Sequence, residues 1–153
     1  MLVKEKVLVY ATWQDCLLTF TQPKFPEAGR QVVGGTLTVG EQVEKAALRE
    51  LAEESGIYVG QVEALLGYYT YSMSSFGKNE IQSRHVVHVK IPDAYQTPLA
   101  WTHFEKHAES GESSIEFRLE WVPLFAGPID LIAGHDFFLP MLKHALRPME
   151  RQL

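Results

Sequence analysis

Cysteine is almost absent from this chain of 153 residues, because Cys16 is the only one. No disulfide can therefore form within the chain, and Cys16 lies in an apolar run where we expect a buried thiol. The sequence also lacks an apolar run long enough to cross a bilayer, and its N-terminus lacks the pattern of a signal peptide. We therefore expect a cytoplasmic protein without a membrane partner.

Clustered positive charge is missing as well. The formal net charge is −5, and no block of basic residues occurs along the chain. Nucleic acid is thus not an expected partner, because proteins bind it largely by neutralising its phosphates. The same negative charge would repel a free polyphosphate unless a metal ion offset it locally.

Internal repeats, low-complexity tracts and linker-like segments are absent too. The chain is long enough for one sizeable core, and its 46% apolar and 22% charged residues are typical of a globular protein. We therefore predict one domain over residues 1–153. The sequence leaves a homodimer open.

The distribution of apolar residues predicts a mixture of strands and helices. The predicted strands cover residues 3–11, 16–21, 31–33, 61–73, 81–91 and 115–124, and the first two form a hairpin around residues 13–15. The predicted helices cover residues 41–55 and 131–146, with Pro140 kinking or splitting the second. Residues 22–29 and 92–112 are expected to be irregular. This order indicates an α/β sandwich with a mixed sheet.

The helix predicted over residues 41–55 is bounded by glycines. Its residues are mostly good helix formers, and Gly56 is placed to end it in a left-handed conformation. Ile57 can then fold its side chain back onto the last turn. Gly34 and Gly35 precede the helix, where they allow either a tight turn or a close approach of the backbone to a ligand.

Three carboxylates share one face of this helix at about 100° per residue: Glu50, Glu53 and Glu54. We expect Leu48, Leu51 and Ala52 to point the other way, into the core. Two unit charges 4 Å apart repel by roughly 4 kcal/mol at an effective dielectric of 20, so such carboxylates are solvated, share protons or hold a cation. Oxygen ligands of this kind favour Mg²⁺ or Mn²⁺ over zinc.

Two interpretations of this acidic face are open from the residues alone. Charge-rich helix surfaces are common, so the face can be an ordinary solvated one. The glycine pair before the helix and the fixed spacing of the acids favour a metal site instead. A backbone carbonyl from the glycine loop could then add a ligand.

Residues 35–57 resemble the Nudix box, G-x5-E-x7-R-E-U-x-E-E-x-G-U with U aliphatic, and every fixed position is filled. The resemblance implies a Nudix-type α/β/α sandwich with a mixed β-sheet. It also implies metal-dependent hydrolysis of a nucleoside diphosphate linked to another group. By motif position the metal ligands are Gly35, Glu50, Glu53 and Glu54, with Arg49 orienting the carboxylates and Glu41 bracing the start of the helix.

The resemblance further suggests one more carboxylate outside the box, on a loop that faces the metal. Glu109, Glu112 and Glu116 are the candidates. We choose Glu112 as a catalytic residue, because the neighbouring glycine and serines suit a mobile loop. The alternative is a solvent-exposed glutamate without a role. The general base is then Glu50, Glu53 or Glu112.

Substrate contacts outside the box are less well defined by the sequence. Arg30 and Arg84 could meet phosphates, or they could form surface ion pairs. Tyr69 could stack on a base, or it could belong to the core of its strand.

The resemblance leaves the substrate open among nucleoside triphosphates, nucleotide sugars and dinucleotides. The alternative function is a non-catalytic Nudix module that binds a nucleotide or a protein partner. Such modules usually lose carboxylates of the box, and all are present here. An isoprenoid diphosphate or an mRNA cap is a third option, and the lack of a basic face argues against the cap.

Overall fold

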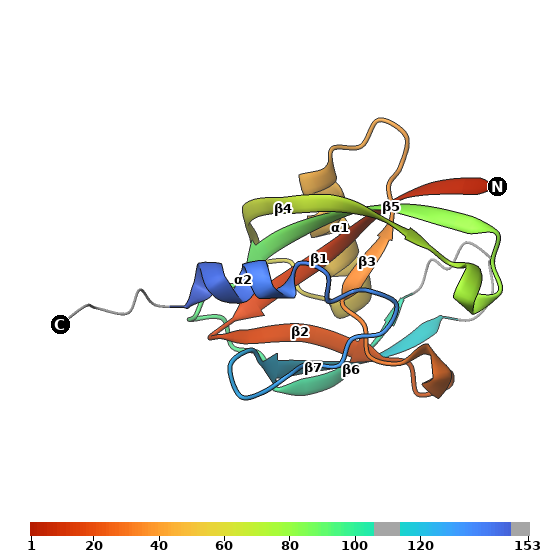
Figure 1. Cartoon of the computed structure of the whole chain (residues 1–153). Coiled ribbons are helices and arrows are strands. Elements are labelled where there is room, and N and C mark those ends of the chain that lie inside the picture. Colours follow the sequence, from red (N-terminus) through yellow and green to blue (C-terminus); the bar gives the residue numbers. More distant parts are fainter. Residues whose placement is uncertain (106–113, 148–153) are drawn as a thin grey trace.

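A seven-stranded β-sheet with one helix on each side forms the fold (Figure 1). The computed structural model describes residues 1–105 and 114–147. The strands are β1 (Leu2–Trp13), β2 (Cys16–Thr21), β3 (Val33–Thr36), β4 (Gln61–Ser72), β5 (Glu80–Lys90), β6 (Ala100–Glu105) and β7 (Ile115–Pro123). The helices are α1 (Val43–Ser55) and α2 (Leu139–Leu146), and short 3-10 turns lie at Pro26–Ala28 and Ser74–Phe76. Within the described ranges, neither helix has the length and apolar character needed to cross a bilayer.

The sheet is mixed, as the sequence predicts. Its strand order is β4-β5-β1-β2-β7-β6, with β3 paired to β1. β1 and β5 run parallel, whereas the other pairs are antiparallel. The predicted hairpin between β1 and β2 is confirmed, since Trp13 pairs with Cys16. Gln14 and Asp15 form its two-residue turn with positive φ angles of 48° and 62°, which suit the twist of a hairpin.

β1 is buried on both of its faces, because a core lies on each side of the sheet. The sheet and the helix on each side are the three layers. Val7 and Val9 point into the core beneath α1, while Leu8 and Tyr10 point into the second core beneath α2. All four side chains are buried, because alternate residues of a strand face opposite sides of the sheet. The α/β/α arrangement that the sequence predicts is therefore confirmed.

The C-terminal end of α1 agrees with the prediction. Gly56 adopts the left-handed conformation, with φ of 80°, and its N–H donates to the carbonyl of Ala52. Ile57 is buried against the same core as α1. These contacts fix the last turn, which carries two of the acidic side chains.

The orientation predicted for α1 was wrong in part. Leu51 is buried as expected, but Leu48 is 37% exposed and Ala52 is only half-buried. The acidic face is not a solvent-facing one, because Glu50 and Glu54 are buried near the sheet. The helix therefore lies with Glu50 and Glu54 at the edge of the core. In this orientation Leu48 points away from the sheet.

Two strand boundaries also differ from the prediction. Residues 100–105 form strand β6, where an irregular segment was expected. Gly34 and Gly35 lie inside β3 and pair with Leu8 and Val7, so they do not form a turn.

The last predicted helix is only half as long as expected. α2 spans Leu139–Leu146, and Pro140 lies in its first turn, where no backbone N–H is required of it. The helix cannot extend back to residue 131, because Ala133 and Gly134 have positive φ angles of 58° and 70°. Pro140 therefore starts this helix and does not kink it.

The observed orientation of α1 predicts unequal costs for two leucines of the same helix. Leu51→Ala should lower the free energy of unfolding by about 2–5 kcal/mol, because it empties a fully buried site. Leu48→Ala should cost less than about 1 kcal/mol, since that side chain is partly exposed. Urea unfolding of both variants measures the difference, and equal costs would contradict the orientation described above.

Candidate active site

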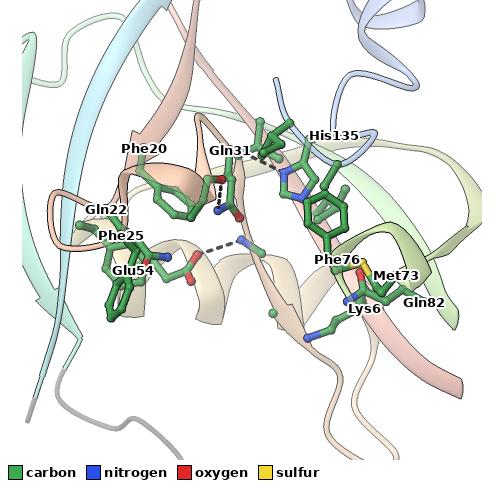
Figure 2. A pocket seen from close by; sticks show the side chains of 18 of the residues that line it. Lys6, Phe20, Gln22, Phe25, Gln31, Glu54, Met73, Phe76, Gln82 and His135 are labelled. Carbon is green, nitrogen blue, oxygen red and sulfur yellow. Dashed lines mark hydrogen bonds between the residues drawn. The ribbon is translucent and has the colours of Figure 1, made fainter. Parts of the chain in front are cut away.

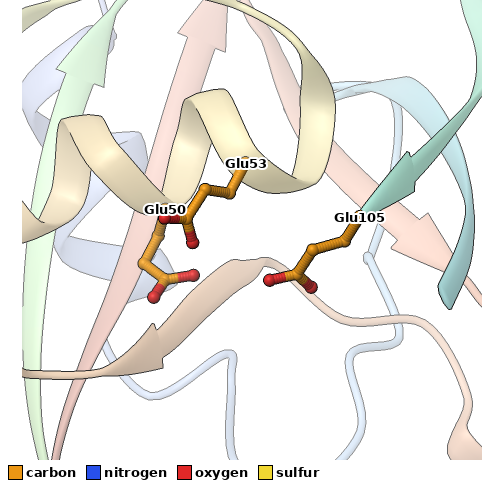
Figure 3. A group of neighbouring side chains, drawn as sticks. All are labelled: Glu50, Glu53 and Glu105. Atoms are coloured by element: carbon orange, nitrogen blue, oxygen red, sulfur yellow. The ribbon is translucent and has the colours of Figure 1, made fainter. Parts of the chain in front are cut away.

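Three carboxylates from two elements converge at one end of α1. Glu50 and Glu53 come from the helix, and Glu105 comes from the end of β6 (Figure 3). One oxygen from each lies within 4.8 Å of the others. Glu54 is buried nearby, and its Oε1 accepts a hydrogen bond of 2.9 Å from the N–H of Gly34. The box carboxylates thus face a residue that lies about fifty positions later in the chain.

Arg49 holds two of these carboxylates in place. Its Nη1 donates to Oε1 of Glu50 at 2.8 Å and to the carboxylate of Glu53 at 3.3 Å. Glu41 orients the guanidinium in turn, because it accepts from Nε at 2.7 Å and from Nη2 at 2.9 Å. The Arg49 hydrogen bond holds the pKa of Glu41 down at about 2. Glu41 also accepts from the N–H of Thr38, so it braces the start of the helix as predicted.

The glycine pair of β3 makes room for the acidic cluster. A Cβ atom at Gly35 would overlap the carboxylate of Glu50, and one at Gly34 would overlap the carbonyl of Val7. Any larger residue at position 35 would therefore push Glu50 out of position. The close approach that the sequence suggested at this pair is made by a carboxylate of the chain itself.

Burial raises the pKa of two of the carboxyl groups, those of Glu50 and Glu54. It raises the pKa of Glu50 to about 7, although Arg49 opposes this shift. It also raises the pKa of Glu54 well above the ordinary range, against the opposing hydrogen bond from Gly34. Neighbouring carboxylates add to both shifts. A positive charge among these oxygens would favour their ionised forms, and such a set of oxygen donors is one that hard divalent cations prefer.

A pocket of about 640 Å³ adjoins the acidic cluster (Figure 2). Gly34, Gly35, Glu54 and Glu105 line it at the acidic side. The aromatic residues in its walls are Phe20, Phe25, Phe76 and Phe117, and the cationic ones are Lys6, Lys78 and Arg84. A pocket of this size and mixed polarity suits a small molecule.

The structure places the three predicted substrate-binding residues differently. Arg84 lines the pocket and is 1% exposed. Arg30 forms an ion pair of 3.0 Å with Glu120. Tyr69 is buried, and its hydroxyl donates to the carbonyl of Gly134. Arg30 and Tyr69 are not among the described residues that line the pocket.

Glu105 is the acidic residue that the sequence analysis missed. Glu109 and Glu112, two of the three candidates considered there, lie outside the described residues, and Glu116 lies on β7. The missed signal is an alternation in β6: Trp101 donates from Nε1 to the carbonyl of Ser55 at 2.9 Å, and His103 lies beside Gly56. Glu105 follows at the same spacing, so all three side chains face the C-terminal half of α1.

The family model described as NUDIX domain matches residues 5–136. This chain belongs to the NUDIX family. The matched range contains the glycine pair, all the box carboxylates and Glu105. Membership places this NUDIX protein in the class of the Nudix hydrolases.

Solved structures of low sequence identity share the fold of this NUDIX protein. An ADP-ribose pyrophosphatase from Streptococcus suis has 13% identity and a TM-score of 0.55, covering 96% of this chain and 94% of that one. A MutT protein from Methanosarcina mazei has 16% identity and a TM-score of 0.60, with coverages of 95% and 97%. The dihydroneopterin triphosphate pyrophosphohydrolase of E. coli has 18% identity and a TM-score of 0.57, with coverages of 81% and 84%. None of the curated proteins matches the sequence significantly.

The raised pKa of Glu50 predicts how the stability of a Glu50→Gln variant depends on pH when a chelator is present. The unfolded chain loses this proton near pH 4.5, whereas the folded protein keeps it up to about pH 7, so stability falls as pH rises through this window. The amide keeps an acceptor for Arg49 without the buried charge. The variant should therefore match the wild type near pH 5 and be more stable at pH 8 by roughly 1–3 kcal/mol.

Urea unfolding with EDTA at both pH values measures this difference. Glu53→Gln is the matched control, because the side chain of Glu53 is 35% exposed and that of Glu50 only 8%. At pH 8 the stability of Glu53→Gln should differ from that of the wild type by less than the stability of Glu50→Gln does. A Glu50→Gln variant that is less stable than the wild type at pH 8 would contradict the prediction.

Proposed function

We propose that this Nudix hydrolase uses Mg²⁺, or Mn²⁺ in its place, to hydrolyse a nucleoside diphosphate linked to another group. Nucleoside triphosphates, nucleotide sugars and dinucleotides are the substrate classes. The observation that carries the proposal is the position of the acidic cluster at one side of a pocket of about 640 Å³. This arrangement would bring a diphosphate to the carboxylates while the rest of the substrate occupies the pocket.

The residues that would hold the metal are Glu50, Glu53 and Glu54 from α1, with Glu105 as the carboxylate from outside the box. Gly35 remains our candidate for a backbone ligand. Nudix enzymes generally use divalent ions, and the donor set here consists of oxygens. When bound, such an ion neutralises the diphosphate and lowers the pKa of a bound water. Without it, the negative charges of cluster and substrate would repel each other.

The protein's own groups would position the reacting water and accept its proton. Glu53 is the more exposed of the two carboxylates that Arg49 holds, so water can reach its oxygens. Arg49 keeps these oxygens close to Glu105, and Glu41 prevents the guanidinium from turning away. We therefore favour Glu53 as the general base and Arg49 as a positioning residue.

The solved structures of similar fold support diphosphate chemistry but differ in the substrate that their names give. One is named as acting on ADP-ribose and another on dihydroneopterin triphosphate. Both substrates contain a diphosphate, while the attached groups have little in common. We infer that the shared fold fixes the diphosphate site and that the pocket of each protein selects the remainder.

A non-catalytic binding module is the competing function. A module without chemistry has no need of carboxylates that are buried or braced beside a cavity, because each buried charge costs stability. Here Glu41 and Arg49 are arranged to keep Glu50 and Glu53 in place. This brace favours the enzyme.

Two glutamates of α1 provide a direct test of the proposed function. Turnover of a panel of nucleoside triphosphates, nucleotide sugars, ADP-ribose and dinucleoside polyphosphates should require Mg²⁺ and stop with EDTA. Glu53→Gln should lower kcat by at least about 100-fold, because it removes both a metal ligand and the proposed base. Glu44→Gln is the control, since Glu44 is exposed in the first turn of the same helix.

Phosphate release, coupled to a pyrophosphatase or phosphatase, reports the turnover. Thermal unfolding with and without Mg²⁺ shows that both variants remain folded. Equal activity of Glu53→Gln and the wild type would refute the site assignment. Retained binding of a nucleotide without any turnover in the wild type would favour the binding module.

A further inference from the structure

A buried histidine lines the pocket away from the acidic residues. His135 lies between β7 and α2 and is 7% exposed. Its Nδ1 accepts a hydrogen bond of 3.2 Å from the backbone N–H of Val32, so this nitrogen carries no proton. Burial, assisted by the nearby Arg84, lowers the pKa of His135 to about 3. The ring is therefore neutral at physiological pH, with its one proton on Nε2.

The Nε2–H of His135 has no hydrogen-bond partner within residues 1–105 and 114–147. His135 lines the pocket, so an acceptor for this donor can be supplied by a molecule bound there. The ring is also held firmly in place. Tyr10 donates to the carbonyl of His135 at 2.6 Å, and the N–H of His135 donates to Ile132.

Gln31 offers a hydrogen-bond acceptor in the lining of the pocket, in addition to the donor of His135. Its Nε2 donates to the carbonyl of Ala28 at 3.1 Å, which fixes the amide so that Oε1 is the remaining acceptor. Gln31 precedes Val32, the residue that holds His135, and Figure 2 shows the two side chains on the same side of the pocket. The pocket is thus lined by both a donor and an acceptor from the protein.

The rest of this region suits a planar ring with an electron-rich edge. Phe76 lies on the side of His135 in Figure 2, whereas Phe25 lies across the pocket on the side of Glu54. Arg84 is buried beside His135, and within the described part of the chain it forms hydrogen bonds but no ion pair with a carboxylate. Its charge favours an oxygen over an amino group at this end of the pocket.

We infer that Gln31 and His135 recognise the lactam edge of a nucleobase, in which a ring carbonyl lies beside a ring N–H. The carbonyl oxygen accepts from Nε2–H of His135, and the ring N–H donates to Oε1 of Gln31. Adenine and cytosine present the reverse order of donor and acceptor, so both pairs would be mismatched. This inference rests on the proposed function, because it assigns the substrate class of the same site.

Matched nucleotide pairs test the inference. Inosine and adenosine triphosphates differ only at this edge, and uridine and cytidine triphosphates form the pyrimidine pair. Two neutral hydrogen bonds predict that the lactam member of a pair is preferred by about tenfold or more in kcat/KM. Equilibrium binding of the non-hydrolysable α,β-methylene analogues with Mg²⁺ gives the same comparison without turnover. A preference in only one pair tells whether purines or pyrimidines are the ligands.

Two conservative variants of His135 separate recognition from folding. In His135→Asn the amide oxygen can still accept from Val32, but no donor reaches the position of Nε2. In His135→Gln the longer amide can return a donor to that position. The preference should fall below about twofold in the first variant and be partly restored in the second. Glu44→Gln should keep the full preference, and thermal unfolding confirms that each variant is folded.

Equal binding of both members in each pair, or no binding of any of them, would overturn the inference. An unchanged preference in His135→Asn would do so as well. Failure of the proposed function looks different: the analogues would show the lactam preference, while none of the parent nucleotides would be hydrolysed. Hydrolysis without a lactam preference would leave the proposed function standing and refute only the inference.

Discussion

The repulsion among closely spaced carboxylates is the constraint on which the site depends. Glu50, Glu53 and Glu105 have oxygens within 4.8 Å of one another, and Glu54 is buried beside them. One guanidinium, that of Arg49, lies against two of these groups and is itself fixed by Glu41. The fold thus brings several carboxyl groups together in a partly dry place, where a cation would favour their ionised forms.

The sheet provides the geometry for this arrangement. β3 lies beside α1 with glycines in place of side chains, so the Glu50 carboxylate rests directly against backbone. β6 lies at the edge of the sheet and directs Trp101 and Glu105 toward the same helix. The pocket opens between these elements and the segment that carries His135, so the acidic end and the end with His135 belong to one continuous cavity.

Local signals were sufficient for the helix with the box, its left-handed end at Gly56, the hairpin and the class of the fold. Each of these depends on residues close together in the sequence. The sequence did not reveal which way α1 turns, because the exposure of Leu48 depends on how Glu50 packs against the glycines of β3. It also did not reveal Glu105 or the pairing of His135 with Val32, since both contacts join residues about fifty to a hundred positions apart. The short α2 could have been foreseen from Pro140.

The pairing of β1 has a consequence for how the protein folds. β1 lies parallel to β5 along eleven registered pairs from Leu2 with Glu80 to Thr12 with Lys90. Each of these contacts closes a loop of nearly eighty residues, and such non-local contacts slow the search for the native topology. The hairpin with β2 can form early, whereas the central strand is completed only after β5 has been made. Until then the two apolar faces of β1 remain accessible to other chains, so aggregation competes with folding at this strand.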